Sequence, residues 1–417
     1  MNPPRILVVG GGFGGLWAVR ALRGAPVEIT LVDRCNYHLF QPLLYQVATA
    51  GLSSPDIAAP LRHILRKQDN VDVLLAEVVR IEPPARRVHL SDGSALDYDM
   101  LVLASGAGHA YFGHDDWAAH APGLKTLDDA LRLRRRLLLA FERAEAEADP
   151  ERRVGWLSFA IIGGGPTGVE LAGTLAEIAR HTLRREFRHI DPASAKVRLI
   201  EAGPRVLSSF PETLSGKARK QLERLGVDVI TGTPVTDIGA DGYRLGDTFV
   251  RAHTVVWAAG VAGSPLARSL GVPLDRAGRL AVAPDLSVPG HGDIFVIGDL
   301  ASVTQDGKPV PGVAPAAKQM GNHVARVIRA RLGGGTAPAF RYRDYGNLAT
   351  IGRMAAVVDL RGLRISGALA WWFWLLAHVF FLIGFRNRLA VLLNWTWAYW
   401  SYQRAARIIV GESVPPS

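Results

Sequence analysis

The chain has 417 residues, 48% of them hydrophobic, so it is long enough for two or three domains with a sizeable core. Its single cysteine, Cys35, excludes a disulfide framework and any chemistry that needs a cysteine pair. The net charge of +10 suits binding to an anionic membrane surface. The chain has no basic run with interleaved aromatics of the kind that binds nucleic acid, and its scattered histidines lack the spacing of a metal site.

The first predicted element is a dinucleotide-binding turn at the N-terminus. An apolar strand at Ile6–Val9 runs into Gly10, Gly12 and Gly15, which stand in G-x-G-x-x-G register at the start of a helix. This pattern allows a tight turn, close approach of a pyrophosphate, and a helix N-terminus directed at its charge. The next strand ends at Asp33, 23 residues after Gly10, close to the spacing of a carboxylate that binds a ribose hydroxyl.

Two later strands are predicted to complete this site. Segment 96–108 is a strand that ends in a small-residue turn containing Ala104 and Gly106. Segment 293–299 is an apolar strand that ends at Asp299, where a carboxylate suits a flavin ribityl hydroxyl or, alternatively, a helix N-cap.

A second fingerprint of the same kind stands in the middle of the chain. The strand Phe159–Ile162 leads into Gly163, Gly165 and Gly168, again in G-x-G-x-x-G register and again before a helical pattern. A single match is weak, because glycine-rich turns are common, but two matches framed by strand and helix are not coincidental. Two nucleotides in one polypeptide indicate a flavin that is reduced by a nicotinamide.

The acidic partner of the second fingerprint is predicted to be Glu201, at the end of strand 196–201. A carboxylate here hydrogen-bonds a ribose 2′-hydroxyl and repels a 2′-phosphate, so NADH is expected over NADPH. Glu201 lies 38 residues after Gly163, a long interval that predicts a helix continuing through 180–195. A small-residue turn at Gly260 resembles the turn that contains Ala104 and Gly106, and Gly260 is assigned to NADH binding as well.

These patterns predict an α/β fold with two Rossmann-like dinucleotide-binding domains, one interrupted by the other. The first domain occupies 1–153 and 291–360, and the nucleotide domain inserted in it occupies 154–290 after a charged linker at 143–153. Residues 361–417 form a separate C-terminal part.

The C-terminal part has the composition of a membrane anchor. Residues 361–410 contain six arginines, no acid and six of the ten tryptophans of the chain, and 368–385 has His378 as its only titratable group. Tryptophan prefers the headgroup level of a bilayer and arginine prefers anionic lipid. Two amphipathic helices lying in the interface are expected, while a true span and a buried dimer interface stay open.

The motifs together resemble the type II NADH:quinone oxidoreductases, the single-subunit, non-proton-pumping family, over essentially the full length. The resemblance rests on the two fingerprints and on several longer motifs. These are NYHLFQPLLYQVATAGLS (36–53), GGGPTGVELAG (163–173), VIGD (296–299), APAAKQMG (314–321) and FLIGFRNR (381–388). It implies a flavoprotein with non-covalent FAD, held on a membrane by its C-terminal helices, that oxidises NADH and reduces a membrane quinone.

The resemblance also assigns residues. The acid that such enzymes carry after the second fingerprint falls on Glu170, near nicotinamide and flavin; the alternative is a solvated acid favoured by the helix dipole. The quinone-pocket motif falls on 314–321, where Gln319 matches its second glutamine and Pro315 replaces its first. An ordinary polar helix residue is the alternative for Gln319.

The location implied is the cytoplasmic side of the cell inner membrane, peripheral and monotopic, with the bilayer surface as partner and a homodimer left open. Two other functions are weighed against this one. A soluble flavoprotein reductase for a ferredoxin would not need the tryptophan- and arginine-rich tail. A non-enzymatic NADH sensor would show no turnover with a quinone.

Overall fold

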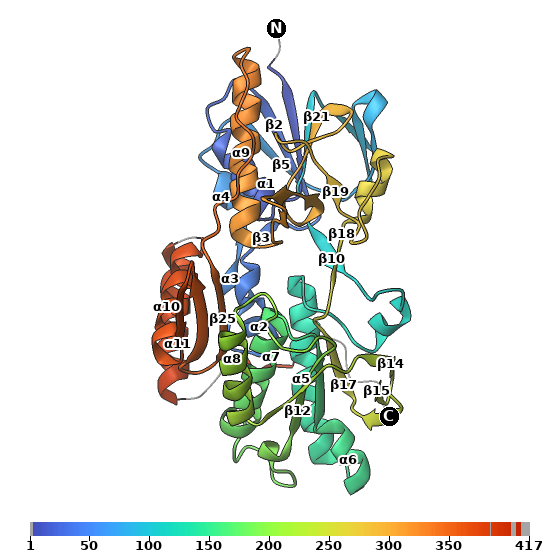
Figure 1. Ribbon diagram of the computed structural model, residues 1–417, viewed down its shortest axis with the longest axis vertical. Coiled ribbons are helices and arrows are strands. Elements are labelled where there is room, and N and C mark those ends of the chain that lie inside the picture. Colours follow the sequence, from blue (N-terminus) through green and yellow to red (C-terminus); the bar gives the residue numbers. More distant parts are fainter. Residues whose placement is uncertain (1–2, 384, 402–405, 410–417) are drawn as a thin grey trace. The chain divides into compact units, whose positions relative to one another are not determined.

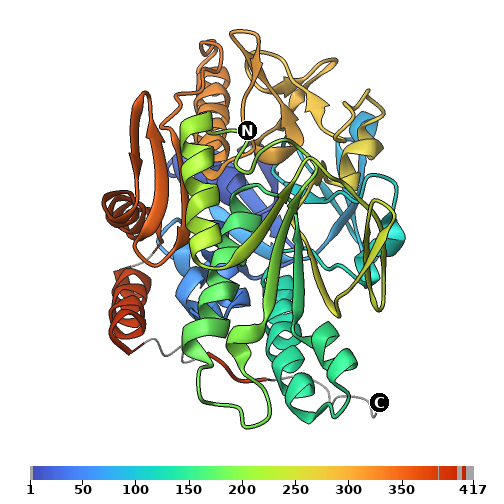
Figure 2. The same ribbon diagram turned by 60° about the horizontal axis from the view of Figure 1, so that its bottom comes forward.

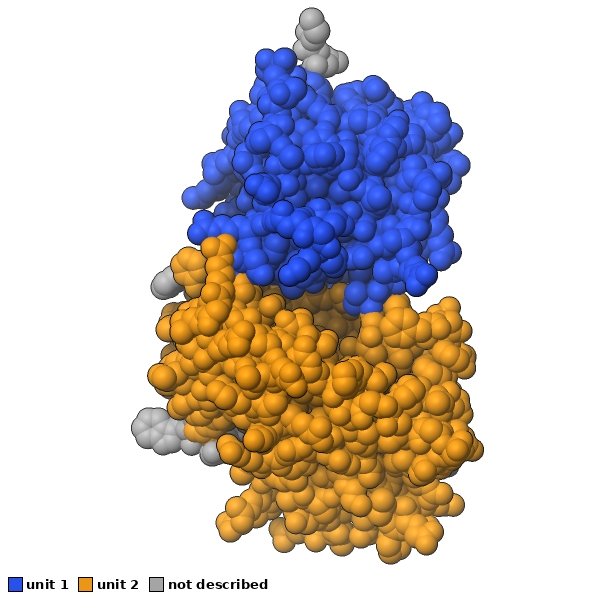
Figure 3. All heavy atoms as spheres, in the orientation of Figure 1, with its two compact units in different colours: residues 1–39, 58–108, 261–345 blue, residues 40–57, 109–260, 346–417 orange. Residues whose placement is uncertain are grey.

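The computed structural model describes residues 3–383, 385–401 and 406–409, and it contains two compact units. Unit 1 comprises 1–39, 58–108 and 261–345, and unit 2 comprises 40–57, 109–260 and 346–417 (Figure 3). Each unit combines segments that are far apart in the sequence, as expected when one domain interrupts another. The unit boundaries do not coincide with the predicted domain boundaries at 153, 290 and 360. Residues 109–153 and 346–360 belong to unit 2, and residues 261–290 belong to unit 1.

Unit 1 is built on a six-stranded sheet whose strands are parallel except at one edge. The strands, in spatial order, are β20 (Ser287–Val288), β21 (His291–Val296), β9 (Met100–Leu103), β1 (Arg5–Val9), β2 (Glu28–Asp33) and β5 (Val71–Leu75). Their near-continuous apolar runs suit strands that are covered on both faces. This doubly wound arrangement agrees with the predicted Rossmann-like fold.

Two helices of unit 1 lie side by side, α1 (Phe13–Ala21) and α9 (Ala314–Leu332) (Figure 1). A side chain at Gly321 would collide with the carbonyl oxygen of Gly14, so this close approach needs a glycine. Helix α9 contains the whole motif at 314–321 and packs directly on the helix of the first fingerprint.

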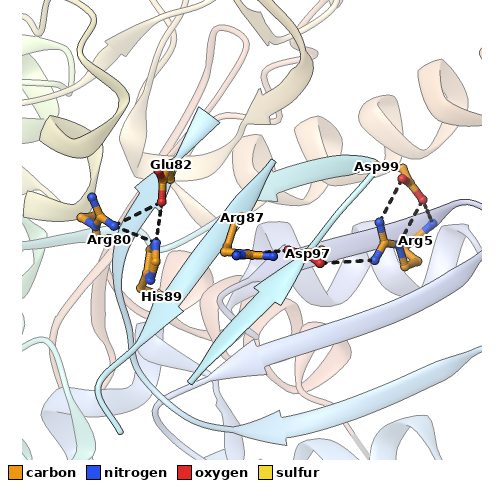
Figure 4. Close-up of polar contacts among 7 residues, drawn as sticks. All are labelled: Arg5, Arg80, Glu82, Arg87, His89, Asp97 and Asp99. Atoms are coloured by element: carbon orange, nitrogen blue, oxygen red, sulfur yellow. Dashed lines mark hydrogen bonds and ion pairs between the residues drawn. The ribbon is translucent and has the colours of Figure 1, made fainter. Parts of the chain in front are cut away.

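Unit 1 also carries a three-stranded antiparallel sheet with polar contacts on its surface (Figure 4). Its strands are β6 (Val78–Glu82), β7 (Arg87–Leu90) and β8 (Ala95–Asp97). Arg87 pairs with Asp97 at 2.6 Å, and Arg5 of β1 pairs with Asp99 at 3.3 Å. These side chains are 41–51% exposed, so water screens the pairs and each contributes little stability.

Unit 2 is built on a four-stranded parallel sheet. The strands, in spatial order, are β13 (Val227–Thr231), β12 (Lys196–Glu201), β11 (Ser158–Ile162) and β17 (Thr254–Trp257). The longer helices before α10 are α5 (Leu127–Ala146), α6 (Pro150–Trp156), α7 (Pro166–Glu177) and α8 (Glu212–Arg224). A three-stranded sheet contacts β17 and is formed by β14 (Val235–Gly239), β15 (Gly242–Leu245) and β16 (Thr248–Arg251).

The chain also contains several shorter elements. They are α2 (Leu44–Ala48), α3 (Ser54–Ile57), α4 (Leu61–Leu65), the hairpin β23 (Thr304–Gln305) and β24 (Lys308–Pro309), and the pair β3 (Tyr37–Leu39) and β4 (Ala58–Pro60).

The helix predicted through 180–195 is wrong. Helix α7 ends at Glu177, a single π-helical turn follows at Ile178–Thr182, and Arg185 adopts a left-handed conformation that a helix cannot continue. The carboxylate of Glu145 accepts the backbone N–H groups of the next loop, including that of Ile190 at 3.1 Å. The long interval before Glu201 is thus filled by a capped loop rather than by helix.

The charged linker predicted at 143–153 is also mostly wrong. Only residues 147–149 separate α5 from α6, because Pro150 starts a new helix instead of ending one. Proline fits the first helical position, where no N–H partner is needed, and the side chain of Asp149 caps the turn by accepting from the N–H of Glu151 at 2.9 Å.

The C-terminal part of unit 2 begins with an antiparallel sheet between helices. Its strands are β25 (Asn347–Gly352), β26 (Ala355–Leu360) and β27 (Leu363–Ser366). Helix α10 (Ala368–Phe381) packs on one face of this sheet, and α7 and α8 pack on the other (Figure 2). The two helices predicted in the tail are therefore confirmed as α10 and α11 (Phe385–Ser401). No helix among the described residues is long and apolar enough to cross a membrane.

Candidate functional site: two dinucleotide-binding turns

The first fingerprint forms the turn that its sequence predicts. Gly10 has φ +104°, which favours glycine, and a side chain at Gly15 would collide with the carbonyl of Gly10. A Cβ at Gly12, in contrast, meets nothing within 4 Å. The first and third glycines therefore serve the packing of turn and helix, and the second leaves its outer side open to a ligand.

Asp33 lies at the carboxyl end of β2, beside this turn. Its carboxylate accepts the N–H of Gly11 at 2.5 Å and that of Cys35 at 2.7 Å. Burial raises the pKa of Asp33, and these two backbone hydrogen bonds oppose the rise. The carboxylate is thus fixed beside the turn, at the end of the second strand, and its role toward a ribose stays a prediction.

The other residues assigned to this site lie at neighbouring strand ends of unit 1. Ala104 follows β9, and Gly106 adopts φ +69°. Asp299 stands in a short 3-10 turn after β21, beside a cavity of about 10 Å³. Because the N-cap of that turn is Ile297, the N-cap alternative for Asp299 is wrong.

Ser105 was missed by sequence reasoning. Its hydroxyl oxygen is buried and has no hydrogen-bond partner among the described residues, although buried hydroxyls are almost always paired. It lies between Ala104 and Gly106, in the same turn. Three features of this turn are compatible with a bound dinucleotide. They are the open side at Gly12, the fixed carboxylate of Asp33 and the unpaired buried hydroxyl of Ser105.

His38 was also missed. Its Nδ1 is 2.9 Å from the carbonyl oxygen of Gly11, and its ring packs edge-on against Phe13. Burial lowers the pKa of His38 to about 4, so the ring is neutral at physiological pH and Nδ1 donates to the carbonyl. His38 thus stabilises the turn through the carbonyl of Gly11. Its position five residues after Asp33 gave no indication of this contact.

The second fingerprint repeats the first in unit 2. Gly163 has φ +112°, a side chain at Gly168 would collide with the carbonyl of Gly163, and a Cβ at Gly165 meets nothing within 4 Å. The carboxylate of Glu201 accepts the N–H of Gly164 at 2.7 Å and that of Gly203 at 2.7 Å. Glu201 therefore has the same relation to its turn as Asp33, despite the longer interval in sequence.

Gly260 lies in the coil after β17. A side chain there would come within 2.6 Å of the Phe112 ring and 3.0 Å of the Ala110 carbonyl oxygen. The packing of this loop therefore already explains the glycine, and its assignment to NADH remains a prediction.

Glu170 lies on α7 and is only 8% exposed, so the alternative of a solvated acid is wrong. Burial raises its pKa well above the ordinary value, while a hydrogen bond from the backbone of Thr350 opposes the rise. No cation among the described residues adds to this balance. A buried carboxyl group whose pKa is raised in this way is a candidate proton donor, and such perturbed groups concentrate at functional sites.

Gln319 lies on α9, and both ends of its amide are engaged. Its Nε2 donates to the carbonyl of Arg343 at 2.9 Å, and its Oε1 accepts the N–H of Arg343 at 2.8 Å. Pro315 lies in the first turn of the same helix, where proline is tolerated. The structure thus gives Gln319 a role in holding a loop, which the sequence did not predict.

Gln46, in the segment 36–53, and nearby Asp56 contact helix α11. The indole N–H of Trp395 donates to Oε1 of Gln46 at 2.7 Å, and the amide of Asn394 donates to Asp56 at 3.2 Å. These partners are more than 300 residues apart, so no local pattern could have paired them.

Two family models match the chain. Residues 4–321 match the pyridine nucleotide-disulphide oxidoreductases, and residues 345–400 match the NDH2 C-terminal domain.

Curated relatives match over nearly the whole length. The chain is 45% identical to the type II NADH:quinone oxidoreductase Ndh of Mycobacterium tuberculosis, covering 99% of this chain and 92% of that protein. It is 31% identical to the type II NADH:quinone oxidoreductase of Staphylococcus haemolyticus, covering 87% of this chain and 91% of that protein.

Solved structures share the fold. NDH2 from Plasmodium falciparum in complex with NADH matches with a TM-score of 0.88 at 20% identity, over 98% of this chain and 100% of that one. The sulfide:quinone oxidoreductase from Aquifex aeolicus matches with a TM-score of 0.74 at 20% identity, over 92% of each chain.

Proposed function

Since the chain belongs to the type II NADH:quinone oxidoreductases, within the pyridine nucleotide-disulphide oxidoreductase family, we propose that it uses FAD to pass electrons from NADH to a membrane quinone. It is a single-chain, non-proton-pumping NADH:quinone oxidoreductase that works with a flavin and NADH. The finer proposals concern the identity of the flavin, the residues that hold each nucleotide, and the membrane surface on which the enzyme acts.

The repeated carboxylate-and-turn geometry carries the assignment of the two nucleotides. We assign the first turn to FAD, with Asp33 against a ribose, Ser105 and Asp299 near the remainder of the cofactor, and Gly12 beside the pyrophosphate. A bound flavin supplies a two-electron relay between a hydride donor and an acceptor. We assign the second turn to NADH, with Glu201 against the adenosine ribose.

Glu170 and Gln319 serve the reaction in this proposal. The carboxyl group of buried Glu170 is assigned to hold a proton near the reacting rings, in line with the raised pKa that burial gives it. Gln319 donates a hydrogen bond to a carbonyl of the quinone through the second N–H of its amide, since the first donates to Arg343. The C-terminal helices hold the enzyme on the cytoplasmic face of the inner membrane. Their exposed apolar side chains and the absence of acids in 361–410 support attachment to an anionic surface, and a homodimer through this part stays open.

Two measurements test this function. Acid treatment of the purified yellow protein should release FAD, and anaerobic mixing with NADH and then a quinone analogue should bleach and restore the flavin absorbance. A covalently retained flavin, or a flavin that NADH reduces but no quinone reoxidises, contradicts the proposal.

Glu201→Gln is expected to narrow the preference for NADH over NADPH. The change weakens the hydrogen bond from the ribose 2′-hydroxyl of NADH to the carboxylate and removes the charge that repels a 2′-phosphate, together worth on the order of 1–3 kcal/mol. The ratio of kcat/KM values for the two nucleotides should therefore fall by roughly 5- to 150-fold. Asp33→Asn is the matched control, because it changes the equivalent carboxylate of the other turn. It should lower flavin content and leave the ratio unchanged, and an unchanged ratio in Glu201→Gln would place Glu201 elsewhere.

Gln319→Ala is expected to slow reoxidation of the flavin by quinone while leaving its reduction by NADH nearly intact. Loss of one hydrogen-bond donor to the acceptor carbonyl costs about 1–2 kcal/mol, roughly 5- to 30-fold in rate. Stopped-flow absorbance follows each half-reaction separately.

The chain offers a control that separates this role from loop holding. Gln305 holds the adjacent residue Tyr342 through the same pair of backbone hydrogen bonds, at 3.2 and 2.7 Å, but lies outside the predicted quinone motif. Gln305→Ala should therefore disturb the loop without slowing reoxidation. Equal slowing in both variants means that Gln319 acts only by holding the loop at Arg343.

A further inference from the structure

A cavity of about 400 Å³ lies in unit 2 beside α5, and nothing in the proposed reaction uses it. Its polar and aromatic wall is formed by Arg132, Arg135, Arg136, Arg143, Trp156 and His253. No acid is among the described residues that line it. We call this cavity the α5 arginine pocket.

The pocket is separate from the NADH turn. Trp156 comes two residues before β11 and His253 comes one residue before β17, so the pocket lies at the amino ends of these parallel strands. Gly163 and Glu201 stand at the carboxyl ends. A five-residue strand spans roughly 16 Å at about 3.3 Å per residue, so one small ligand cannot occupy both places.

The arginines of the wall are gathered by one helix face. Arg132, Arg136 and Arg143 stand at i, i+4 and i+11 on α5, and like charges at i and i+4 destabilise a helix. Among the described residues, no acid forms an ion pair with these three side chains. Burial lowers the pKa of Arg136, with no acid acting against that effect. The cluster therefore carries a local cost in stability that an anionic ligand would offset.

The wall is also held in place before any ligand arrives. Arg136 donates to the backbone carbonyl of His253 at 2.8 Å, and the His253 ring centre lies 4.1 Å from that of Trp156. The guanidinium of Arg143 lies over the Trp156 ring at 4.8 Å. Gly155 permits this packing, because a Cβ there would lie 2.9 Å from the His253 ring. Such fixed, planar guanidinium groups suit the bidentate recognition of phosphate oxygens.

We propose that the α5 arginine pocket binds a phosphate-bearing polyanion with two or three linked phosphates. The cavity volume falls within the range of small-molecule sites. The same chemistry is offered by an inorganic oligophosphate and by a nucleoside di- or triphosphate, whose base would contact Trp156. Either ligand would bind independently of nucleotide at the second fingerprint.

Isothermal titration calorimetry of the full-length holoprotein tests this, with saturating NAD⁺ present to fill the NADH site. Tripolyphosphate and ATP should both bind at low ionic strength, and adenosine should not. Tighter binding of ATP than of tripolyphosphate identifies a nucleotide as the ligand, and equal binding identifies the phosphates alone as the recognised group. Absence of binding by both phosphate compounds, or binding only when NAD⁺ is omitted, overturns the proposal.

Variants locate the site. Arg132→Gln/Arg143→Gln removes two of the guanidinium groups that line the pocket, and it should weaken ATP binding at least about tenfold, since charge-assisted hydrogen bonds are the strong ones. Arg152→Gln is the matched control, because Arg152 lies on the neighbouring α6 with its side chain 72% exposed and does not line the pocket. It should leave affinity unchanged. The same affinity in both variants overturns the proposal, and thermal unfolding of the double variant without ligand confirms that it is folded.

Discussion

Replacing Leu369, Leu376 and Phe380 together by aspartate is expected to release the protein from anionic lipid vesicles. These side chains are 64–75% exposed and share one face of α10, at i, i+7 and i+11. The opposite face carries Trp371 and Trp374, which are buried, and α10 packs on β26 and β27. The substitutions therefore leave the packed face of the helix intact.

The expected effect is large because each side chain loses the free energy of transfer into lipid. Burying a leucine or phenylalanine is worth about 1.5–3 kcal/mol, so three losses weaken binding at least about a thousandfold. Three added negative charges are also repelled by an anionic surface. Vesicle co-sedimentation measures the loss, and turnover with a water-soluble quinone should persist.

Phe249→Asp is the matched control, because Phe249 is a 50% exposed apolar residue of β16, outside the C-terminal helices. It should leave vesicle binding unchanged. A parent protein that does not bind vesicles, and whose dimer dissociates in the triple variant, would show that this face is a protein interface. That result would reject attachment of α10 to the membrane.

Glu170→Gln is expected to remove a pH dependence from the stability of the protein. Below the ordinary pKa of a glutamate, near 4.3, the group is protonated in the folded and the unfolded chain, and the full stability is present. Above it, the unfolded chain ionises while buried Glu170 stays protonated, because burial raises its folded pKa. The free energy of unfolding therefore falls as pH rises toward the folded pKa, by up to about 1.4 kcal/mol per pH unit.

Denaturant unfolding of the parent and Glu170→Gln chains between pH 5 and 8 measures this difference. Glutamine has nearly the shape of the protonated acid and cannot ionise, so the variant should gain stability relative to the parent as pH rises. Glu223→Gln, which removes a carboxylate whose side chain is 45% exposed, should run parallel to the parent. Parallel curves for Glu170→Gln would mean that Glu170 is ionised in the folded protein.

What the sequence by itself determined is local. The strand before each fingerprint, the spacing of its glycines and the acid at the end of the next strand predict the two nucleotide turns, and the structure forms them with Gly10, Gly163, Asp33 and Glu201 at the expected places. These features follow from backbone sterics and strand periodicity, which act over a few residues. The two tail helices are predicted for the same reason, since their apolar composition is continuous.

Only the tertiary structure decided which of these residues are buried and what they contact. Glu170 is buried rather than solvated because β25 covers α7. Gln319 is hydrogen-bonded to the backbone of Arg343 because a loop that follows α9 packs back on that helix. The loop at 183–195 and the α5 arginine pocket likewise depend on partners far away in sequence. Such contacts are set by the packing of whole elements, which no short stretch of residues encodes. The same packing raises the pKa of Glu170 by burying it, and it leaves one face of α10 exposed.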